Sequence, residues 1–319
     1  EARRQRQLPG NRQRAQLHDD RIKMVVSSEL YPFQGAYLDL NGHRLHYIDE
    51  GKGETLVMLH GNPTWSFYYR NLIKAFRDRY RVIVPDHIGC GKSDKPAADA
   101  YPYTLRQRVS DLEALLEKLG VKDNITLVVH DWGGMIGMTF ATLHPEKIKR
   151  LVILNTGAFH LPKTKPMPWS LRFCRLPGIG PMLVRGANGF SRAAVSWCAT
   201  RKPLTPEIAH GYLAPYNNWE NRVAVLRFVQ DIPLAPGDEG YDLVSKVEEN
   251  IGQFRKVPTL ICWGDRDFVF DHHFLAQWTK YLPEAELHRF PDAGHYVLED
   301  AGEEIIGLIG TFLKKHPIP

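Results

Sequence analysis

Short runs of aliphatic residues alternate with amphipathic stretches through the first half of the chain. The runs predict β-strands at residues 36–40, 43–49, 55–59, 81–85, 125–129 and 150–154. Helical patterns lie between them at residues 67–76, 105–119 and 133–143. Asn41-Gly42 predicts a hairpin turn between the first two strands. Near-continuous aliphatic strands that alternate with helices are typical of a mostly parallel sheet covered by helices on both faces.

This alternation stops near residue 157 and resumes with a strand at 257–262. A helix, a strand at 286–290 and a helix at 303–314 complete the pattern. The intervening hundred or so residues contain many prolines and aromatic residues and no convincing strand. We therefore predict an α/β core formed by residues 24–156 and 241–319, with a helical cap inserted at residues 157–240. Residues 1–23 are basic and lack the apolar centre of a secretory signal, so we interpret them as a mobile leader.

The composition excludes several classes of protein but does not indicate a reaction. The chain has 319 residues, of which 43% are hydrophobic and 24% charged, and this excludes disordered and collagen-like classes. The net charge is only +5, with much of the excess in the leader, so no nucleic-acid partner is predicted. The best apolar run, from Thr126 to Leu143, carries Asp131 at its centre, so no membrane span is predicted. The four cysteines form no CxxC pair and no zinc-like spacing, so we predict no metal site and a cytoplasmic location.

The sharpest chemical motif is VVHDWGG at residues 128–134. An aliphatic strand ends in Asp131, and small residues follow where a helix must begin. This pattern resembles the strand–turn–helix elbow of α/β-hydrolases, with an aspartate where a serine usually lies. Asp131 is then a nucleophile raised above the sheet, and the backbone N–H of Trp132 faces the same space. The alternative is an aspartate that only caps the following helix.

Two further motifs follow in the order of acid and then histidine that this fold requires. CWGDRD at residues 262–267 ends the strand after the insertion and places Asp267 in the acid position. DAGH at residues 292–295 follows the last strand, where the base belongs. Three such groups at three strand ends predict a catalytic triad of Asp131, His295 and Asp267.

A fourth motif, HGNPT at residues 60–64, lies where such loops supply an oxyanion donor. Asn62 offers a side-chain amide and Trp132 an indole N–H, so the two predict a pocket for a departing anion. The alternatives are a turn residue before proline for Asn62 and simple packing for Trp132. Asn155 occupies the position where some aspartate-nucleophile hydrolases carry the acid; as an amide it cannot serve as the charged partner of an imidazolium, which favours Asp267.

Together the motifs HGNPT, HDWGG, WGDRD and DAGHY resemble the haloalkane dehalogenase branch of the α/β-hydrolases. That resemblance implies that Asp131 displaces halide to form an alkyl ester, which a histidine-activated water hydrolyses. It also implies that Asn62 and Trp132 hold the halide. Epoxide hydrolases share HDWGG but need two tyrosines in the cap. Tyr212 and Tyr216 are available, although their spacing equally suits packing on one helix face.

A longer resemblance, from about residue 36 to 316, is to the β-lactone decarboxylases that form the B component of bacterial long-chain olefin biosynthesis. It is carried by VPDHIGCGKSDKP at 84–96, HDWGGMIGM at 130–138, LVILNTGAF at 151–159, MPW at 167–169, APYNNWENRVAVLRFVQDIPL at 214–234 and HYVLED at 295–300. The resemblance implies decarboxylation of cis-3,4-dialkyl β-lactones to cis-olefins and CO₂. It also implies two protein partners, a β-lactone synthetase and a reductase, in an assembly beside a membrane.

Aromatic residues in the predicted cap suit a hydrophobic small-molecule substrate. They are Trp169, Phe173, Phe190, Trp197, Tyr212, Trp219 and Phe228. No Gly-rich phosphate loop follows the first long strand, so no cofactor is predicted, and Arg70 is interpreted as a surface or structural group. A dehalogenase, or a binding module on a hydrolase scaffold, remains an alternative. Attack at the ring carbon or at the carbonyl, the chain length and the oligomeric state stay open.

Overall fold

The computed structural model describes residues 26–318, so the leader predicted at residues 1–23 lies outside the described residues. Eight strands form one sheet in the order β1-β2-β4-β3-β5-β6-β7-β8. The strands are β1 (Ala36–Leu40), β2 (His43–Glu50), β3 (Thr55–Leu59), β4 (Arg81–Pro85), β5 (Ile125–Asp131), β6 (Ile148–Thr156), β7 (Thr259–Gly264) and β8 (Glu286–Phe290). The sequence predicted all eight near these bounds. β1 and β2 pair antiparallel with their neighbours, and the strands from β3 to β8 are parallel.

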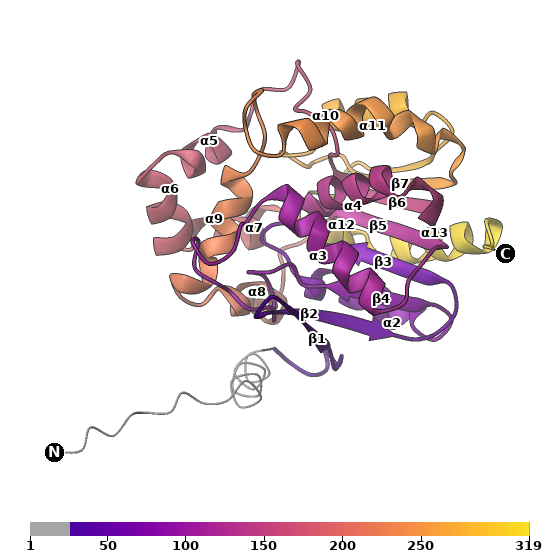
Figure 1. Ribbon diagram of the computed structural model, residues 1–319, viewed down its shortest axis with the longest axis horizontal. Helices are drawn as coiled ribbons and strands as arrows, with labels where there is room; N and C mark the ends of the chain where they lie inside the picture. Colours follow the sequence, from indigo (N-terminus) through magenta and orange to yellow (C-terminus); the bar gives the residue numbers. More distant parts are fainter. Residues whose placement is uncertain (1–25, 319) are drawn as a thin grey trace.

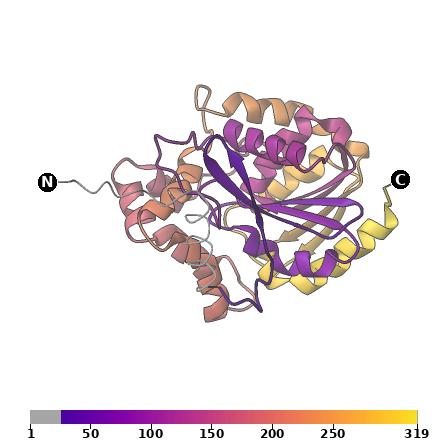
Figure 2. The same cartoon turned by 60° about the horizontal axis from the view of Figure 1, so that its bottom comes forward.

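Helices cover both faces of the sheet, as Figures 1 and 2 show. The reason is visible in β3, where Val57 and Leu59 enter one core cluster and Leu56 and Met58 enter the other. Successive side chains of a strand point to opposite faces, so an entirely aliphatic strand needs cover on both. One face is covered by α3 (Leu105–Lys118), α4 (Trp132–Leu143), α10 (Tyr241–Asn250) and α11 (His272–Tyr281). The other face is covered by α2 (Arg70–Phe76) and α13 (Gly302–Lys315).

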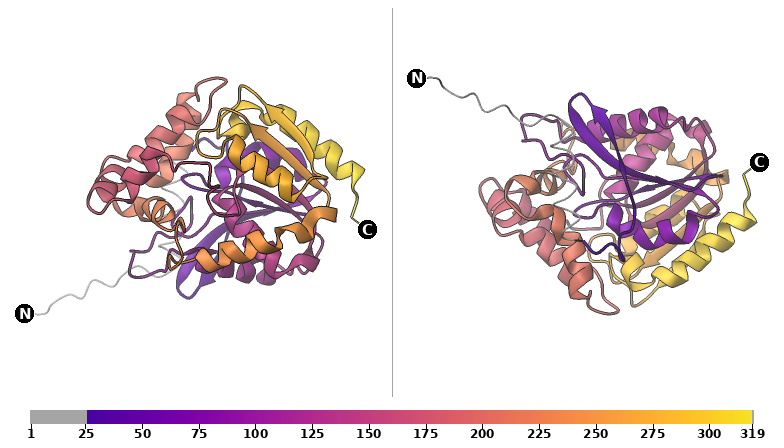
Figure 3. Two further views of the ribbon diagram at one scale, coloured as in Figure 1. Left: turned by 90° about the horizontal axis from the view of Figure 1, so that it is seen from above. Right: turned by 90° about the horizontal axis from the view of Figure 1, so that it is seen from below.

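The segment between β6 and α10 contains helices and no strand. Its helices are α5 (Trp169–Arg175), α6 (Ile179–Pro181), a π-helical turn (Met182–Gly186), α7 (Gly189–Trp197), α8 (Pro206–Leu213) and α9 (Val223–Gln230). Figure 3 shows this group at one end of the sheet. Parallel strands end at one edge, so the loops after β3, β5, β7 and β8 all face the helical segment. No helix in residues 26–318 is long and apolar enough to cross a membrane.

Candidate active site

Asp131 occupies a sharp turn between β5 and α4. Its backbone has φ 51° and ψ −126°, and its side chain makes no capping hydrogen bond to α4, so the interpretation as a helix cap is wrong. The turn needs glycines after it: a Cβ on Gly133 would lie 1.9 Å from the Leu59 carbonyl oxygen, and one on Gly134 would lie 1.9 Å from Thr156 Oγ1. Strained backbone of this kind is characteristic of functional sites. The strain here raises a carboxylate above the end of the sheet.

The two oxygens of Asp131 have different surroundings. The backbone N–H of Asn62 donates to Oδ1 at 2.6 Å. His295 Nε2 lies 3.6 Å from Oδ2. One oxygen is therefore held by a backbone amide while the other faces the histidine, an arrangement that suits nucleophilic attack by Oδ2.

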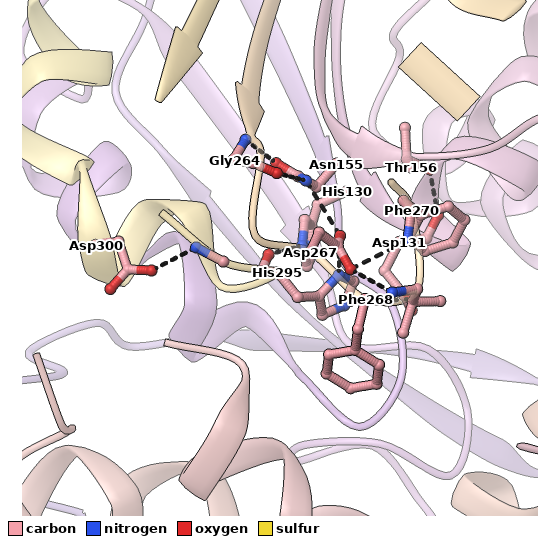
Figure 4. A network of polar contacts seen from close by, with 12 residues as sticks. His130, Asp131, Asn155, Thr156, Gly264, Asp267, Phe268, Phe270, His295 and Asp300 are labelled. Atoms are coloured by element: carbon pink, nitrogen blue, oxygen red, sulfur yellow. Dashed lines mark hydrogen bonds and ion pairs between the residues drawn. The ribbon is translucent and has the colours of Figure 1, made fainter. Parts of the chain in front are cut away.

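His295 connects Asp131 to the predicted acid. His295 Nδ1 lies 2.7 Å from Asp267 Oδ2. The other oxygen of Asp267 accepts the backbone N–H groups of Val269 at 2.7 Å and Phe270 at 3.0 Å. Figure 4 shows this chain of contacts. Asp267 fixes the imidazole so that Nε2 points at Asp131.

Charge and burial oppose each other in this triad. Burial raises the pKa of Asp131; the charge of His295 and the backbone N–H groups of Asn62 and Trp132 oppose it, and the net pKa stays above its ordinary value. Burial lowers the pKa of His295, but Asp267 and Asp131 raise it further, so the net pKa lies above its ordinary value. Two flanking carboxylates thus favour an imidazolium at His295.

A cavity of about 400 Å³ opens onto Asp131, Trp132 and His295. Four of the seven cap aromatics singled out in the sequence line it: Trp169, Phe173, Phe190 and Trp197. The other three do not, because Tyr212 and Phe228 pack into buried clusters and Trp219 stacks under Arg185. The remaining wall is mostly aliphatic and aromatic, so the site suits an apolar substrate.

The model of the alpha/beta hydrolase fold family matches residues 54–302 of the chain. The chain belongs to this family. The cis-3-alkyl-4-alkyloxetan-2-one decarboxylase of Shewanella oneidensis is 59% identical over 89% of this chain and 89% of that protein. The enzyme of the same name from Xanthomonas campestris pv. campestris is 47% identical over 90% of this chain and 98% of that protein.

Haloalkane dehalogenases are more distant relatives of this α/β-hydrolase. Haloalkane dehalogenase 2 of Mycobacterium tuberculosis is 31% identical over 90% of this chain and 98% of that protein. The crystal structure of the haloalkane dehalogenase DatA from Agrobacterium tumefaciens shares the fold, with a TM-score of 0.79. At 24% identity, it covers 91% of this chain and 99% of its own.

The two predicted anion donors, Asn62 and Trp132, both line the cavity with Asp131, but their side chains differ in hydrogen bonding. Asn62 Nδ2 already donates to the Val225 carbonyl at 3.1 Å, and its Oδ1 is buried without a hydrogen-bond partner among the described residues. The contact to Asp131 comes from the Asn62 backbone, which the sequence analysis did not single out. Trp132 lines the cavity, and no described residue accepts a hydrogen bond from its indole N–H. That indole is the freer of the two side-chain donors.

Two supporting residues were missed as parts of the site. Asn155 Nδ2 donates to Asp267 Oδ2 at 3.1 Å, so this amide, considered only as a failed acid, orients the acid. His130 Nε2 lies 2.8 Å from the His295 carbonyl, which fixes that nitrogen as the donor. Burial, with the charge of His295, places the pKa of His130 well below its ordinary value and so disfavours the charged ring. His130 and Asn155 lie at the carboxyl ends of β5 and β6. That position beside the nucleophile and the acid is the feature of the sequence that could have identified both as site residues.

The tyrosines weighed for epoxide hydrolysis do not line the cavity. The Tyr212 hydroxyl donates to Glu299, and the Tyr216 hydroxyl donates to the Thr64 carbonyl at 3.2 Å. Arg70 is buried and pairs with Glu299 at 2.6 Å, so the surface interpretation of Arg70 is wrong and the structural one is right. Neither tyrosine hydroxyl lines the cavity, so neither is placed to protonate an epoxide oxygen there.

Within the described residues, one group could place three metal ligands together: Asp271, His272 and His273. It does not line the cavity. Asp271 already pairs with Lys165 at 2.7 Å and accepts the His273 backbone N–H. All four cysteines are free and buried.

Proposed function

We propose that this protein converts cis-3-alkyl-4-alkyl β-lactones to cis-olefins and CO₂, with Asp131 as the nucleophile. The observation that carries the substrate class is the 59% identity to a decarboxylase of that substrate over 89% of both chains. The geometry supports it, since an apolar cavity leads to a carboxylate with one oxygen held and the other free to attack.

The first step is attack by Asp131 Oδ2 on the ring carbon that carries the ring oxygen. A C–O bond forms to Asp131, and the carbon–ring oxygen bond breaks with its electron pair left on the oxygen. Opening the four-membered ring releases strain and produces a substrate carboxylate. In this proposal the anion is held by the indole N–H of Trp132 and by the second N–H of the Asn62 amide, whose first N–H donates to the Val225 carbonyl.

In the second step, the bond between the substrate carboxylate and the adjacent ring carbon breaks. Its electron pair forms the C=C bond, CO₂ leaves, and the bond to Asp131 breaks and returns its pair to Oδ2. Inversion followed by anti elimination reproduces the cis geometry of the ring. The sequence of steps consumes no water and transfers no proton, so the aspartate is regenerated unchanged.

His295 then acts as a charge partner in our proposal. An imidazolium held by Asp267 stabilises the Asp131 carboxylate that is expelled in the second step. The Asn62 backbone N–H stabilises the other oxygen of the same carboxylate. A better-stabilised carboxylate is a better leaving group.

Haloalkane dehalogenation is the second candidate, favoured by the 31% identity to haloalkane dehalogenase 2. The same Asp131 would form an alkyl ester by expelling halide, and His295 would activate water. Esterification removes the Asp131 charge that raises the pKa of His295, so the imidazole would become neutral enough to act as a base.

A product assay separates the two candidates. Purified protein receives a synthetic cis-3,4-dialkyl β-lactone or, separately, a panel of 1-haloalkanes. We expect cis-olefin and CO₂ in equal amounts from the lactone and negligible halide release. Halide and alcohol from the haloalkanes with an untouched lactone would overturn the decarboxylase proposal.

Isotope labelling separates attack at the ring carbon from attack at the carbonyl. A lactone with ¹⁸O at the ring position should deliver the label to CO₂, because the ring oxygen becomes part of the leaving carboxylate. Attack at the carbonyl forms a mixed anhydride and leaves the ring oxygen on the other carbon. Unlabelled CO₂ would therefore contradict the proposed first step.

The His295→Gln variant tests whether water takes part. Without a water-dependent step, the variant still releases olefin, more slowly, and mass spectrometry of the intact protein finds no lasting ester. The Asp267→Asn variant is the matched control, because it keeps the imidazole and loses its charged partner. Accumulation of an Asp131 ester with no olefin in His295→Gln would favour the hydrolytic route.

We also propose that residues 157–240 act as the cap over this site and that no cofactor takes part.

The same reaction implies an upstream β-lactone synthetase and reductase as partners, in the cytoplasm. A pull-down from cells with the full chain as bait, followed by separate assays for β-lactone synthesis and for the reductase, checks this. Absence of both activities from the captured material would count against the partners.

A further inference from the structure

The cap exposes an unusual number of large apolar side chains over a short stretch. Five such residues lie in α5, α6 and the π-helical turn that follows, a sixth lies between α5 and α6, and a seventh ends α7. We call them the cap rim: Trp169, Phe173, Leu176, Ile179, Met182, Leu183 and Trp197. Trp169 and Met182 are each 71% exposed and Trp197 is 61% exposed. The ring centroids of Trp169 and Phe173 lie 6.0 Å apart. Large apolar side chains exposed close together mark an interaction site in a folded protein.

The same stretch carries only positive charge. Residues 157–206 contain eight lysines and arginines and no aspartate or glutamate, whereas the whole chain has 41 basic and 36 acidic residues. Lys163, Arg172, Arg192 and Lys202 are exposed and form no ion pair within the described part of the chain. The other four bind carbonyl oxygens or acidic side chains of the protein. Four cations are therefore free to meet a negatively charged surface.

The cap rim is also the mouth of the active-site cavity. Trp169, Phe173, Leu183 and Trp197 belong to the rim and line the cavity that ends at Asp131. Figure 1 shows α5 and α6 at the far end of the helical segment from the sheet. The exposure of the rim side chains shows that the outer side of this region is uncovered. Whatever binds the rim therefore lies over the mouth.

We propose that the cap rim docks the mouth of the cavity on an anionic phospholipid bilayer. Exposed aromatic and aliphatic side chains flanked by lysine and arginine are the combination that binds at such an interface. Residues 157–206 carry lysines and arginines and no aspartate or glutamate. The segment should therefore bind a bilayer that contains anionic lipid more tightly than a neutral one. The inference rests on the proposed function in one respect: a β-lactone with two long alkyl chains partitions into lipid, and docking lets it enter the cavity without crossing water.

Vesicle co-sedimentation of the full chain tests the surface without any substrate. The probes are vesicles of phosphatidylcholine alone and of phosphatidylcholine mixed with phosphatidylglycerol. We expect binding to the mixed vesicles, weaker binding to phosphatidylcholine alone, and release from the mixed vesicles at high salt. Failure of the wild-type chain to bind mixed vesicles at low salt overturns the proposal.

The decisive variant changes rim residues that do not line the cavity: Leu176→Glu, Ile179→Glu and Met182→Glu together. We expect at least tenfold weaker binding to mixed vesicles. The matched control is Leu143→Glu with Leu287→Glu, two exposed leucines of the core, 39% and 38% accessible. The control should bind like wild type. Equal binding by the triple variant and wild type, or an equal loss in the control, contradicts the proposal.

The charge contribution has its own variant, Arg172→Gln with Arg192→Gln. Each removed charge should weaken binding to the mixed vesicles about fivefold and leave binding to phosphatidylcholine nearly unchanged. Turnover of a water-soluble short-chain cis-β-lactone without vesicles should stay at the wild-type rate in all these variants, which also shows that they fold. Since vesicle binding is measured without substrate, failure of the docking proposal and failure of the decarboxylase proposal give separate results.

Discussion

Replacing Gly61 by alanine should disable the nucleophile directly. A Cβ at Gly61 would lie 1.9 Å from Asp131 Oδ1 and 2.4 Å from Asp131 Cβ. Ordinary van der Waals contact begins at 3.4 Å, so the carboxylate must move by 3.4 minus 1.9, or 1.5 Å. The φ angle of Gly61 is not in the left-handed region, so the backbone itself accepts alanine. The space taken by Asp131 is the reason that residue 61 must be glycine.

The expected loss follows from that displacement. Misplacing a reacting group by about 1 Å costs about 10²-fold in rate, and losing one oxyanion donor costs about 10²–10³-fold. The 2.6 Å hydrogen bond from the Asn62 N–H to Asp131 is broken by the same movement. We therefore expect kcat for a short-chain cis-β-lactone to fall between about 10² and 10⁴-fold in Gly61→Ala.

The matched control is Gly307→Ala, where a Cβ in α13 would meet nothing within 4 Å. That variant should turn over at the wild-type rate and gain about 1 kcal/mol of helix stability. Rates are compared per folded molecule, with the folded fraction measured by thermal unfolding. A Gly61→Ala rate within threefold of wild type would refute the reasoning, because it would show that Asp131 can attack from another position.

Four further variants or conditions test the site. Asp131→Asn should abolish turnover in freshly prepared protein with its unfolding midpoint unchanged, and retained olefin release would refute the nucleophile assignment. Asp267→Asn should lower kcat by about 10²–10³-fold, measured on the same lactone, because the imidazolium that stabilises the expelled Asp131 carboxylate loses its charged partner; a loss under tenfold would contradict this. Burial raises the pKa of Asp131 and the charge of His295 opposes that rise, so activity should fall as the pH drops through this raised pKa. His295→Gln removes the opposing charge, so the acid limb of its residual kcat/KM profile should move to higher pH. Asp300→Ala removes the acceptor for the backbone N–H groups of Thr200, Arg201 and Gly294, and should lower the free energy of unfolding by about 3 kcal/mol in urea titration, whereas an unchanged midpoint would contradict that count.

The order of elements and the chemistry at the strand ends were available in the sequence. Period-two and period-3.6 patterns depend on neighbouring residues alone, which is why all eight strands were predicted near their observed bounds. The elbow at Asp131 and the motifs around Asp267 and His295 were equally local. Because parallel strands end at one edge, predicting the sheet was enough to bring these three residues together.

The contacts between distant segments were decided by the tertiary structure. Asn155 contacts Asp267, 112 residues away in the sequence, because β6 lies beside β7. No local sequence pattern around either residue predicts that contact. The Asn62 side chain bonds the Val225 carbonyl, and only four of seven cap aromatics face the cavity, because helix packing sets which side of each helix is inward. The exposure of the cap rim has the same origin. Residue type determined that these side chains are apolar or charged; only the fold decided which of them remained uncovered at the mouth of the site.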